Sequence, residues 1–312
     1  MVNFKDIESA HNRISNFIHN TPIHTCENIN TETNTNVYFK CDNFQKTGSF
    51  KIRGATNTIL QLSKKQLANG VITTSSGNHG AAVASAAGKL GASVKVIMPN
   101  NTPKIKVDNV QRYGGEIIFC KPNIKAREST LKAMVQETGA TIVHPYNDER
   151  IIAGQGTAAK ELLKSIPDLD VIIAPVSGGG LLAGTLLSAK NINPKLKVYG
   201  AEPKNADDTY RSIEKKKIVP NKTTDTIADG LRAQVGTITF PIIQKLADGI
   251  ILVSEEMIIQ SMRMVWQRLK IIIEPSCSIA LAALLINNDQ FYNKRVGLIL
   301  TGGNVDLDTL PW

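Results

Sequence analysis

Lys51 has neighbours that suit a reactive amine. It lies in the stretch KTGSFKIRG at residues 46–54, with glycine, serine and phenylalanine before it and Ile52 after it. An apolar pattern of helical period follows at residues 55–62, so we expect Lys51 at the mouth of a helix in largely dry surroundings. Burial lowers the pKa of an ammonium group and makes such a lysine a candidate for Schiff-base chemistry. The alternative is a surface lysine that caps a helix, and partners elsewhere in the chain must decide.

A run of glycines provides the first such partner. SGGG at residues 177–180 lies between a continuous apolar strand expected at 171–176 and a helix expected at 181–190. Successive glycines let backbone N–H groups converge on an anion at a helix N-terminus, which favours phosphate binding over a turn kept only for packing. The motif has neither the spacing of the GxxxxGK[ST] nucleotide loop nor that of the GxGxxG dinucleotide loop.

Two further polar turns also follow expected strands. SSGNHG at residues 75–80 offers two hydroxyls, an amide and a helix N-terminus, which suit a carboxylate or simply cap a helix. TGGN at residues 301–304 offers a hydroxyl that can share one hydrogen bond with a buried heteroaromatic nitrogen. Each turn is ambiguous alone. Together with Lys51 they predict a ligand site.

These turns can meet only if the strands before them are parallel. Strands are expected at residues 37–40, 71–74, 94–98, 116–119, 141–143, 171–176, 197–201, 250–253 and 296–300. Helical patterns separate most of them, which predicts parallel pairing and a doubly wound α/β architecture in two lobes. In such sheets, ligands collect outside the carboxyl ends of the strands. Residues 204–234 have weak periodicity and are expected to be loop-rich.

Composition restricts the partners and the compartment. The charge balance is 36 − 27 = +9, but lysines are scattered and aromatic residues make up only 5%, so small anions fit better than nucleic acid. Four separated cysteines, Cys26, Cys41, Cys120 and Cys277, indicate reduced thiols. We see no signal peptide and no apolar run of ~18 residues for a membrane span, and therefore expect a cytoplasmic protein.

The lysine segment and the three turns, in this order, resemble the fold-type II pyridoxal-phosphate enzymes, specifically the serine/threonine dehydratase and serine racemase family. The resemblance covers residues 14–312. It implies a two-domain α/β fold similar to the tryptophan synthase β subunit, with open, mostly parallel sheets flanked by helices. Residues 1–69 and 148–312 would form a large domain that binds pyridoxal 5'-phosphate, and residues 70–147 a small domain that grips the substrate.

The resemblance also assigns roles to residues. Lys51 would form the Schiff base with the cofactor. The other cofactor contacts would be Phe50 against the ring, Asn78 at its 3-hydroxyl, Gly178, Gly179, Gly180 and Leu181 at the phosphate, Thr301 at the pyridine nitrogen, and Gly230 and Glu274 near the ring. The substrate carboxylate would be held by Ser75, Ser76, Asn78, His79 and Arg127. The chain departs from the family at Ser177, where a fourth glycine is usual, and at Thr301, where serine is frequent.

The activity implied is dehydration of L-threonine or L-serine to 2-oxobutyrate or pyruvate plus ammonia. Freed Lys51 would remove the Cα proton as general base. Racemisation of serine is the alternative, because Ser76 matches the residue that serves the racemases as acid–base group on the opposite face. Dehydration of threo-3-hydroxyaspartate is also close. We place dehydration first, because a neutral hydroxyl at the pyridine nitrogen makes the ring a weaker electron sink.

A divalent cation and a second subunit complete the expectations. The segment AEPKNADD at residues 201–208 resembles the family's cation site, with carboxylates from Glu202 and Asp208 and the carbonyl of Ala206 around Mg²⁺, or Ca²⁺ or Mn²⁺. An acidic surface loop is the alternative. The family likeness implies a homodimer that acts on a small hydroxyamino acid, with no nucleic acid, no membrane and no C-terminal regulatory domain.

Overall fold

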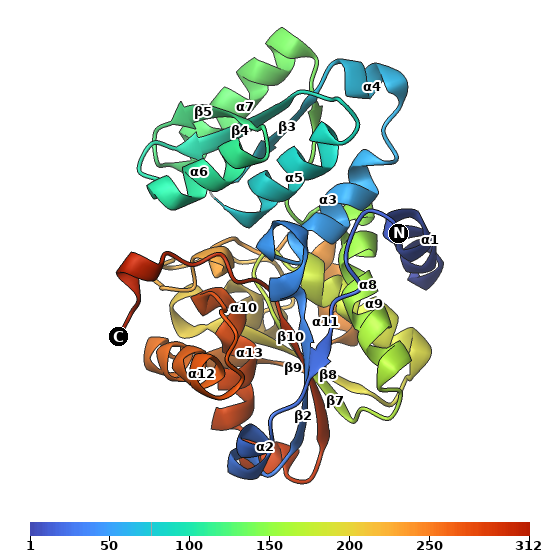
Figure 1. Cartoon of the computed structure of the whole chain (residues 1–312), viewed down its shortest axis with the longest axis vertical. Coiled ribbons are helices and arrows are strands. Elements are labelled where there is room, and N and C mark those ends of the chain that lie inside the picture. Colours follow the sequence, from blue (N-terminus) through green and yellow to red (C-terminus); the bar gives the residue numbers. More distant parts are fainter. Residues whose placement is uncertain (76) are drawn as a thin grey trace.

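Two β-sheets organise the chain. The computed structural model describes residues 1–75 and 77–312, except for the side chain of Ile124. The larger sheet occupies the lower part of the molecule in Figure 1 and the smaller sheet the upper part. We call each sheet with its helices a lobe. This is the mixed α/β architecture of fold-type II enzymes that the sequence predicts.

The larger sheet has the strand order β1-β2-β10-β7-β8-β9 within the described residues. Only β1 pairs antiparallel with its neighbour. The strands are β1 (Ile23–His24), β2 (Asn36–Cys41), β7 (Val171–Pro175), β8 (Lys197–Pro203), β9 (Gly249–Val253) and β10 (Arg295–Leu300). The carboxyl ends of β7 and β10, which precede two of the glycine turns, therefore lie side by side at one edge of the sheet.

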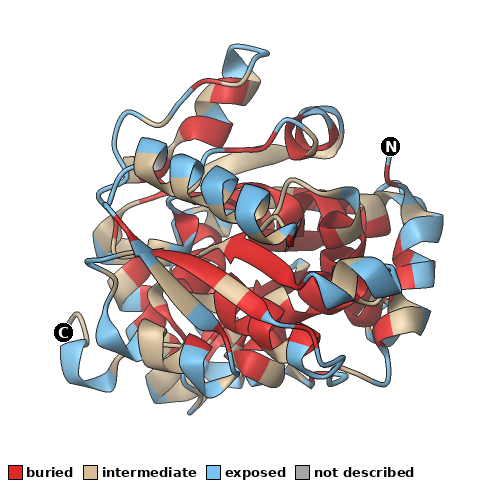
Figure 2. Cartoon of the chain, turned by 90° about the horizontal axis from the view of Figure 1, so that it is seen from above, coloured by how far each residue is buried: buried red, intermediate tan, exposed pale blue. Residues whose placement is uncertain are grey.

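Helices cover both faces of this sheet, and the alternation within β7 shows how. Val171 and Ile173 pack into one buried cluster, whereas Ile172 and Ala174 pack into another on the opposite face. A strand buried on both faces reads as a continuous apolar run, and Figure 2 shows buried strands between helices. The first face carries α2 (Glu27–Thr33), α12 (Glu255–Arg268) and α13 (Pro275–Ile286); the second carries α1 (Phe4–Ile14), α8 (Glu149–Ser165), α9 (Gly180–Ile192) and α11 (Thr239–Leu246).

The smaller sheet is wholly parallel, in the order β5-β4-β3-β6 within the described residues. Its strands are β3 (Val71–Thr74), β4 (Val94–Pro99), β5 (Glu116–Cys120) and β6 (Thr141–Ile142). Helices α5 (Asn78–Gly88) and α6 (Lys104–Arg112) pack on one face, and α7 (Ile124–Thr138) on the other. The short helix α4 (Lys64–Ala68) precedes β3.

The structure differs from the sequence-based expectation in a few elements. The first helix ends at Ile14 rather than near residue 18, and the segment expected to be loop-rich contains α10 (Asp208–Glu214). Nothing in the sequence analysis anticipated α11 either. Within the described residues, no helix is both long enough and apolar enough to cross a membrane.

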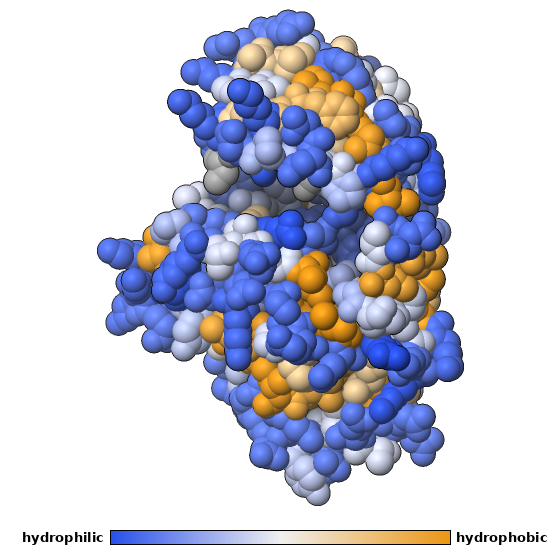
Figure 3. Space-filling view, turned by 90° about the vertical axis from the view of Figure 1, so that its left-hand side faces the viewer, coloured by the Kyte–Doolittle hydropathy of each residue, from blue (hydrophilic) through white to orange (hydrophobic). Residues whose placement is uncertain are grey.

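Helix α3 (Lys51–Ile59) joins the two lobes. It packs against α5 of the small lobe and α8 of the large lobe, and it begins at the candidate lysine. The space-filling view in Figure 3 shows a deep hollow between the upper and lower parts of the molecule.

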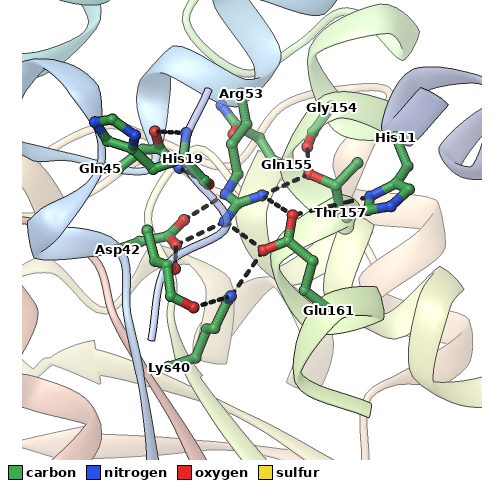
Figure 4. A network of polar contacts seen from close by, with 12 residues as sticks. His11, His19, Lys40, Asp42, Gln45, Arg53, Gly154, Gln155, Thr157 and Glu161 are labelled. Carbon is green, nitrogen blue, oxygen red and sulfur yellow. Dashed lines mark hydrogen bonds and ion pairs between the residues drawn. The ribbon is translucent and has the colours of Figure 1, made fainter. Parts of the chain in front are cut away.

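A buried ion network holds α3 in place (Figure 4). Arg53, two residues after Lys51, is fully buried and donates to both oxygens of Asp42 at 2.6 and 2.8 Å. It also donates to both oxygens of Glu161 in α8, each at 2.8 Å, and Lys40 donates to Glu161 at 2.7 Å. Thr157 adds a further acceptor for Arg53 at 3.1 Å. Two cations and two carboxylates thus neutralise one another, which is the condition for burying them.

Candidate active site

Lys51 is the first residue of α3, and the turn before it is tightly constrained. Thr47 and Gly48 both adopt left-handed backbone conformations, with φ of 64° and 71°. A Cβ atom on Gly48 would lie 2.5 Å from the side-chain oxygen of Asn304, so glycine is required there. The N–H of Phe50 donates to the Thr301 carbonyl at 2.9 Å. The lysine segment is therefore attached directly to the TGGN turn.

The Lys51 amine lies in an environment that favours its neutral form. Its side chain is half-buried, and Nζ donates to the Pro145 carbonyl oxygen at 3.1 Å. Burial lowers the pKa of Lys51 to about 8, against the opposing effect of the Glu274 carboxylate. Nζ also lies 5.2 Å from the centroid of the Phe50 ring. At pH 7 about a tenth of an amine with this pKa is unprotonated, far more than for an ordinary lysine, and this neutral form can act as nucleophile or base.

Asn78 and Glu274 meet beside this amine. The Asn78 amide donates to the two Glu274 oxygens at 2.8 and 3.1 Å, and its own oxygen accepts from Asn304 at 2.8 Å. Burial raises the pKa of Glu274, against the effects of Asn78, Lys106 and Lys51. The structure thus brings together the SSGNHG turn, the TGGN turn and Glu274, as their places in the sequence suggested. The role of Asn304 as the link between them was not anticipated.

The glycine loop leads from β7 into α9. Gly179 has φ of 90°, a conformation that glycine adopts without strain. A Cβ on Gly178 would lie 2.3 Å from the Tyr146 ring, and one on Gly180 would lie 3.1 Å from the same residue. Among the described residues, none accepts a hydrogen bond from the backbone N–H groups of residues 178–181. These N–H groups at a helix N-terminus are available to an anion.

Ser177 uses its hydroxyl within the protein. Its Oγ donates to the Ala233 carbonyl at 3.0 Å and accepts from the Ala233 N–H at 2.9 Å. The departure from glycine therefore ties the loop to the segment that contains Gly230. Gly230 is in turn anchored by its N–H, which donates to Ser276 Oγ at 2.8 Å.

The other residues of the SSGNHG turn that were expected to contact the substrate differ in what they do. Ser75 Oγ accepts from the N–H groups of Gly77 and Gly80, at 3.2 and 3.0 Å, and so helps to cap α5. His79 is buried, and its Nε2 lies 3.1 Å from the Val143 carbonyl. Burial and the nearby Lys51 charge lower the pKa of His79 to about 3, so the ring is neutral. Ser76, expected to touch the substrate and to transfer a proton, lies outside the described residues.

Arg127 and Thr301 belong to different lobes. Arg127 belongs to α7 of the small lobe, is half-buried, and has an Nε for which the described residues offer no acceptor. Its charge acts on Tyr146, which places it towards the glycine loop. Thr301 is buried at the end of β10, and its hydroxyl lies beside the Cys277 thiol.

The carboxylates of the expected cation site are buried together. Burial and the nearby Asp208 raise the pKa of Glu202 to about 8, and burial raises that of Asp208 to about 6. Asp208 Oδ1 is buried without a hydrogen-bond partner among the described residues, whereas Oδ2 accepts from the Val235 N–H at 2.7 Å. Ala206 is also buried. Within the described part of the chain, no cluster of three or more His, Cys, Asp or Glu side chains could hold a metal, so a carbonyl would have to join the two carboxylates.

The sequence analysis did not assign two residues that lie near the site. Tyr146 covers the glycine loop, and Lys106 of α6 forms an ion pair with Asp229 of the large lobe. Tyr146 belongs to the HPYND stretch at residues 144–148, which follows β6, so its position after a strand was a signal that could have found it. Nothing in the local sequence of Lys106 distinguished it from the other lysines.

Comparison with known proteins identifies the family. The family model described as pyridoxal-phosphate dependent enzyme matches residues 14–302. A serine racemase from Dictyostelium discoideum is 47% identical, over 99% of this chain and 97% of its own length. A beta-hydroxyaspartate dehydratase from Paracoccus denitrificans is 44% identical, over 99% and 98%. The structure of maize serine racemase superimposes with a TM-score of 0.97 at 44% identity, over 99% of this chain and 95% of that one. The chain belongs to the family of pyridoxal-phosphate dependent enzymes.

Proposed function

We propose that this enzyme dehydrates a small hydroxyamino acid, L-serine or L-threonine, to a 2-oxo acid and ammonia. The observation that carries the proposal is the Lys51 amine, whose pKa of about 8 suits a group that must both accept and release a proton. Removal of a Cα proton is the step that dehydration and racemisation share. Threo-3-hydroxyaspartate is a further candidate substrate, since a relative 44% identical is named for its dehydration.

The residues present fit pyridoxal phosphate. Lys51 offers the amine, Tyr146 covers the glycine loop, and the N–H groups of residues 178–181, which have no acceptor in the described part of the chain, offer a phosphate site. When bound, this cofactor supplies an electron sink that acidifies the Cα–H bond of an amino acid. Phe50, Asn78, Gly230, Glu274 and Thr301 would surround its ring.

The protein groups would then act as follows. Arg127 and the SSGNHG turn would bind and orient the substrate carboxylate, since Arg127 Nε has no acceptor among the described residues. Lys51 would accept the Cα proton at Nζ. Neutral His79 would form part of the wall, with Nδ1 left as an acceptor because Nε2 faces a carbonyl.

Racemisation of serine is the second candidate. It is supported by the names of relatives from Dictyostelium discoideum and Arabidopsis thaliana, at 47% and 46% identity. The reaction needs an acid–base group on the face opposite Lys51, and we assign that role to Ser76. Both reactions begin with the same proton transfer, so one site can perform both.

A divalent cation and a homodimer remain part of the proposal. Asp208 Oδ1, which has no hydrogen-bond partner in residues 1–75 and 77–312, and the raised pKa values of Glu202 and Asp208 fit a hard cation, because bound positive charge would relieve the cost of two buried carboxylates. The ion would be structural and activating. We also retain the division into a large domain and a small domain of residues 70–147, and the two separate sheets support it.

One experiment separates the candidate reactions. The purified enzyme with pyridoxal phosphate is incubated with L-serine, L-threonine and threo-3-hydroxyaspartate, and both 2-oxo acid and D-serine are measured over time. We expect 2-oxo acid to form faster than D-serine, and Lys51→Ala to abolish both products. The exposed Lys65→Ala serves as the matched control. Faster formation of D-serine would make racemisation the main reaction, and no product from any substrate would refute the proposal.

A further inference from the structure

Lys106 and Asp229 form an ion pair between the two lobes, beside the residues of the candidate site. We propose that this pair determines substrate specificity by making the site prefer amino acids whose side chain carries no charge, so that among the candidate substrates L-serine and L-threonine are preferred over threo-3-hydroxyaspartate. The inference rests on the proposed function, because it concerns the side chain of the amino acid bound there. Three features carry it: the position of Lys106, the anchoring of Asp229, and the cancellation of their charges.

Lys106 extends from α6 of the small lobe into the site. Its side chain is only 24% exposed, and its Cδ lies 3.7 Å from where a Cβ on Gly77 would be. The lysine stem therefore passes the turn that we assign to the substrate carboxylate. The Glu274 carboxylate acts on the Lys106 ammonium as it does on Lys51, and the Arg232 cation acts on Lys106 in the opposite sense, so the effects of these two neighbours on Lys106 oppose each other. The end of Lys106 is thus within reach of the side chain of a bound amino acid.

Asp229 is fixed on the large lobe. It begins the short 3-10 helix Asp229–Leu231, whose Gly230 N–H donates to Ser276 Oγ. Ser276 Oγ also lies 3.5 Å from Asp229 Oδ1, and Ser276 stands two residues after Glu274 at the start of α13. Because these contacts tie the aspartate to two elements of the large lobe, Lys106 is the partner that crosses from one lobe to the other.

The pair as a whole offers no net charge to a ligand. A substrate carboxylate at the β-position would be attracted by Lys106 and repelled by Asp229, and it would have to compete with Asp229 for the ammonium group. A hydroxymethyl group meets neither penalty and can hydrogen-bond to either partner. Removing the negative charge alone would leave an unpaired cation beside the ligand. The selectivity should then change towards amino acids with an acidic side chain.

L-aspartate and L-asparagine test this directly, because they are nearly isosteric and differ in side-chain charge. Each is titrated calorimetrically into the wild-type holoenzyme, Asp229→Asn and Lys106→Gln. We expect the wild type to bind asparagine at least as tightly as aspartate. Asp229→Asn should shift the affinity ratio towards aspartate by about tenfold, and Lys106→Gln should shift it the opposite way. The ratio of kcat/KM for threo-3-hydroxyaspartate to kcat/KM for L-serine should change in the same direction as the affinity ratio in each variant.

Two exposed residues provide matched controls, Asp225→Asn just before the 3-10 helix Asp229–Leu231 and Lys104→Gln on α6, and neither should change the ratio. A ratio in Asp229→Asn within twofold of the wild type would overturn the inference, as would shifts of both variants in one direction or no binding of either amino acid by the wild type. If Asp229→Asn does not fold, the direction of the shift in Lys106→Gln decides. The calorimetric ratio needs no turnover, so loss of the proposed function and loss of this inference are distinguishable.

Discussion

Replacing Arg53 by methionine should destabilise the enzyme strongly. Arg53 is fully buried, and its guanidinium group makes two hydrogen bonds to Asp42 and two to Glu161. Without it, only Lys40 remains to balance two buried carboxylates. Breaking a buried pair by removing one partner costs about 3–5 kcal/mol, because the other charge is left uncompensated.

The expected loss is best measured by equilibrium urea unfolding followed by circular dichroism. A loss of ~3–5 kcal/mol lowers the urea midpoint by roughly 1 M or more. The double variant Arg53→Met/Asp42→Asn provides the control, because it removes one charge of each sign and leaves Lys40 paired with Glu161. Its cost should be smaller than the sum of the two single costs by ~0.5–3 kcal/mol.

Additive costs would refute this account, since they would mean that Arg53 and Asp42 contribute independently. The pH dependence gives a second check. Burial alone would raise the pKa values of Asp42 and Glu161, but Arg53 holds both below their usual values. The stability that they contribute is therefore present above their unfolded pKa values, about 4, and is lost as the pH falls through the folded ones. Arg53→Met should weaken this acid sensitivity.

Three further predictions concern the site. Burial lowers the pKa of Lys51 to about 8, so its neutral fraction rises about tenfold between pH 7 and pH 9. When pyridoxal phosphate is added to the cofactor-free enzyme, the rate at which the ~410 nm absorbance of a lysine imine appears should rise by the same factor. A rate that does not change with pH would contradict this. Gly179→Ala places a side chain at φ of 90° against Thr239, so its dissociation constant for pyridoxal phosphate should rise about tenfold, since the strain costs ~1–2 kcal/mol. Gly91→Ala, at φ of 70° in open space, is the control that should leave cofactor affinity unchanged. Mg²⁺ should raise the thermal midpoint of the wild type but not of Asp208→Asn. An equal rise in both proteins would show that the cation does not bind at Asp208.

The strands and turns that carry the site residues were predicted accurately from the sequence. The strand at residues 71–74 was found with those bounds, and the turns after β3, β7 and β10 all follow their strands as expected. These predictions succeed because they depend on local properties. Apolar runs, glycine turns and helix starts are determined by a few neighbouring residues. By contrast, α10 was missed because its short helix owes its stability to packing and to the acceptors of Glu202, which bind its Thr209 and Tyr210 N–H groups.

By itself the sequence determined the α/β class and the places of Lys51 and of the glycine turns next to their helices and strands, since each follows from the order of residues along the chain. Only the tertiary structure decided which distant side chains meet. It placed Asn304 between Thr47 and Asn78, Arg53 between two carboxylates, and Lys106 on Asp229. The reason is physical: the energy of a buried charge or hydrogen bond depends on partners that folding brings together over long sequence separations. The pattern of residues along the chain does not show which distant side chains will lie close together.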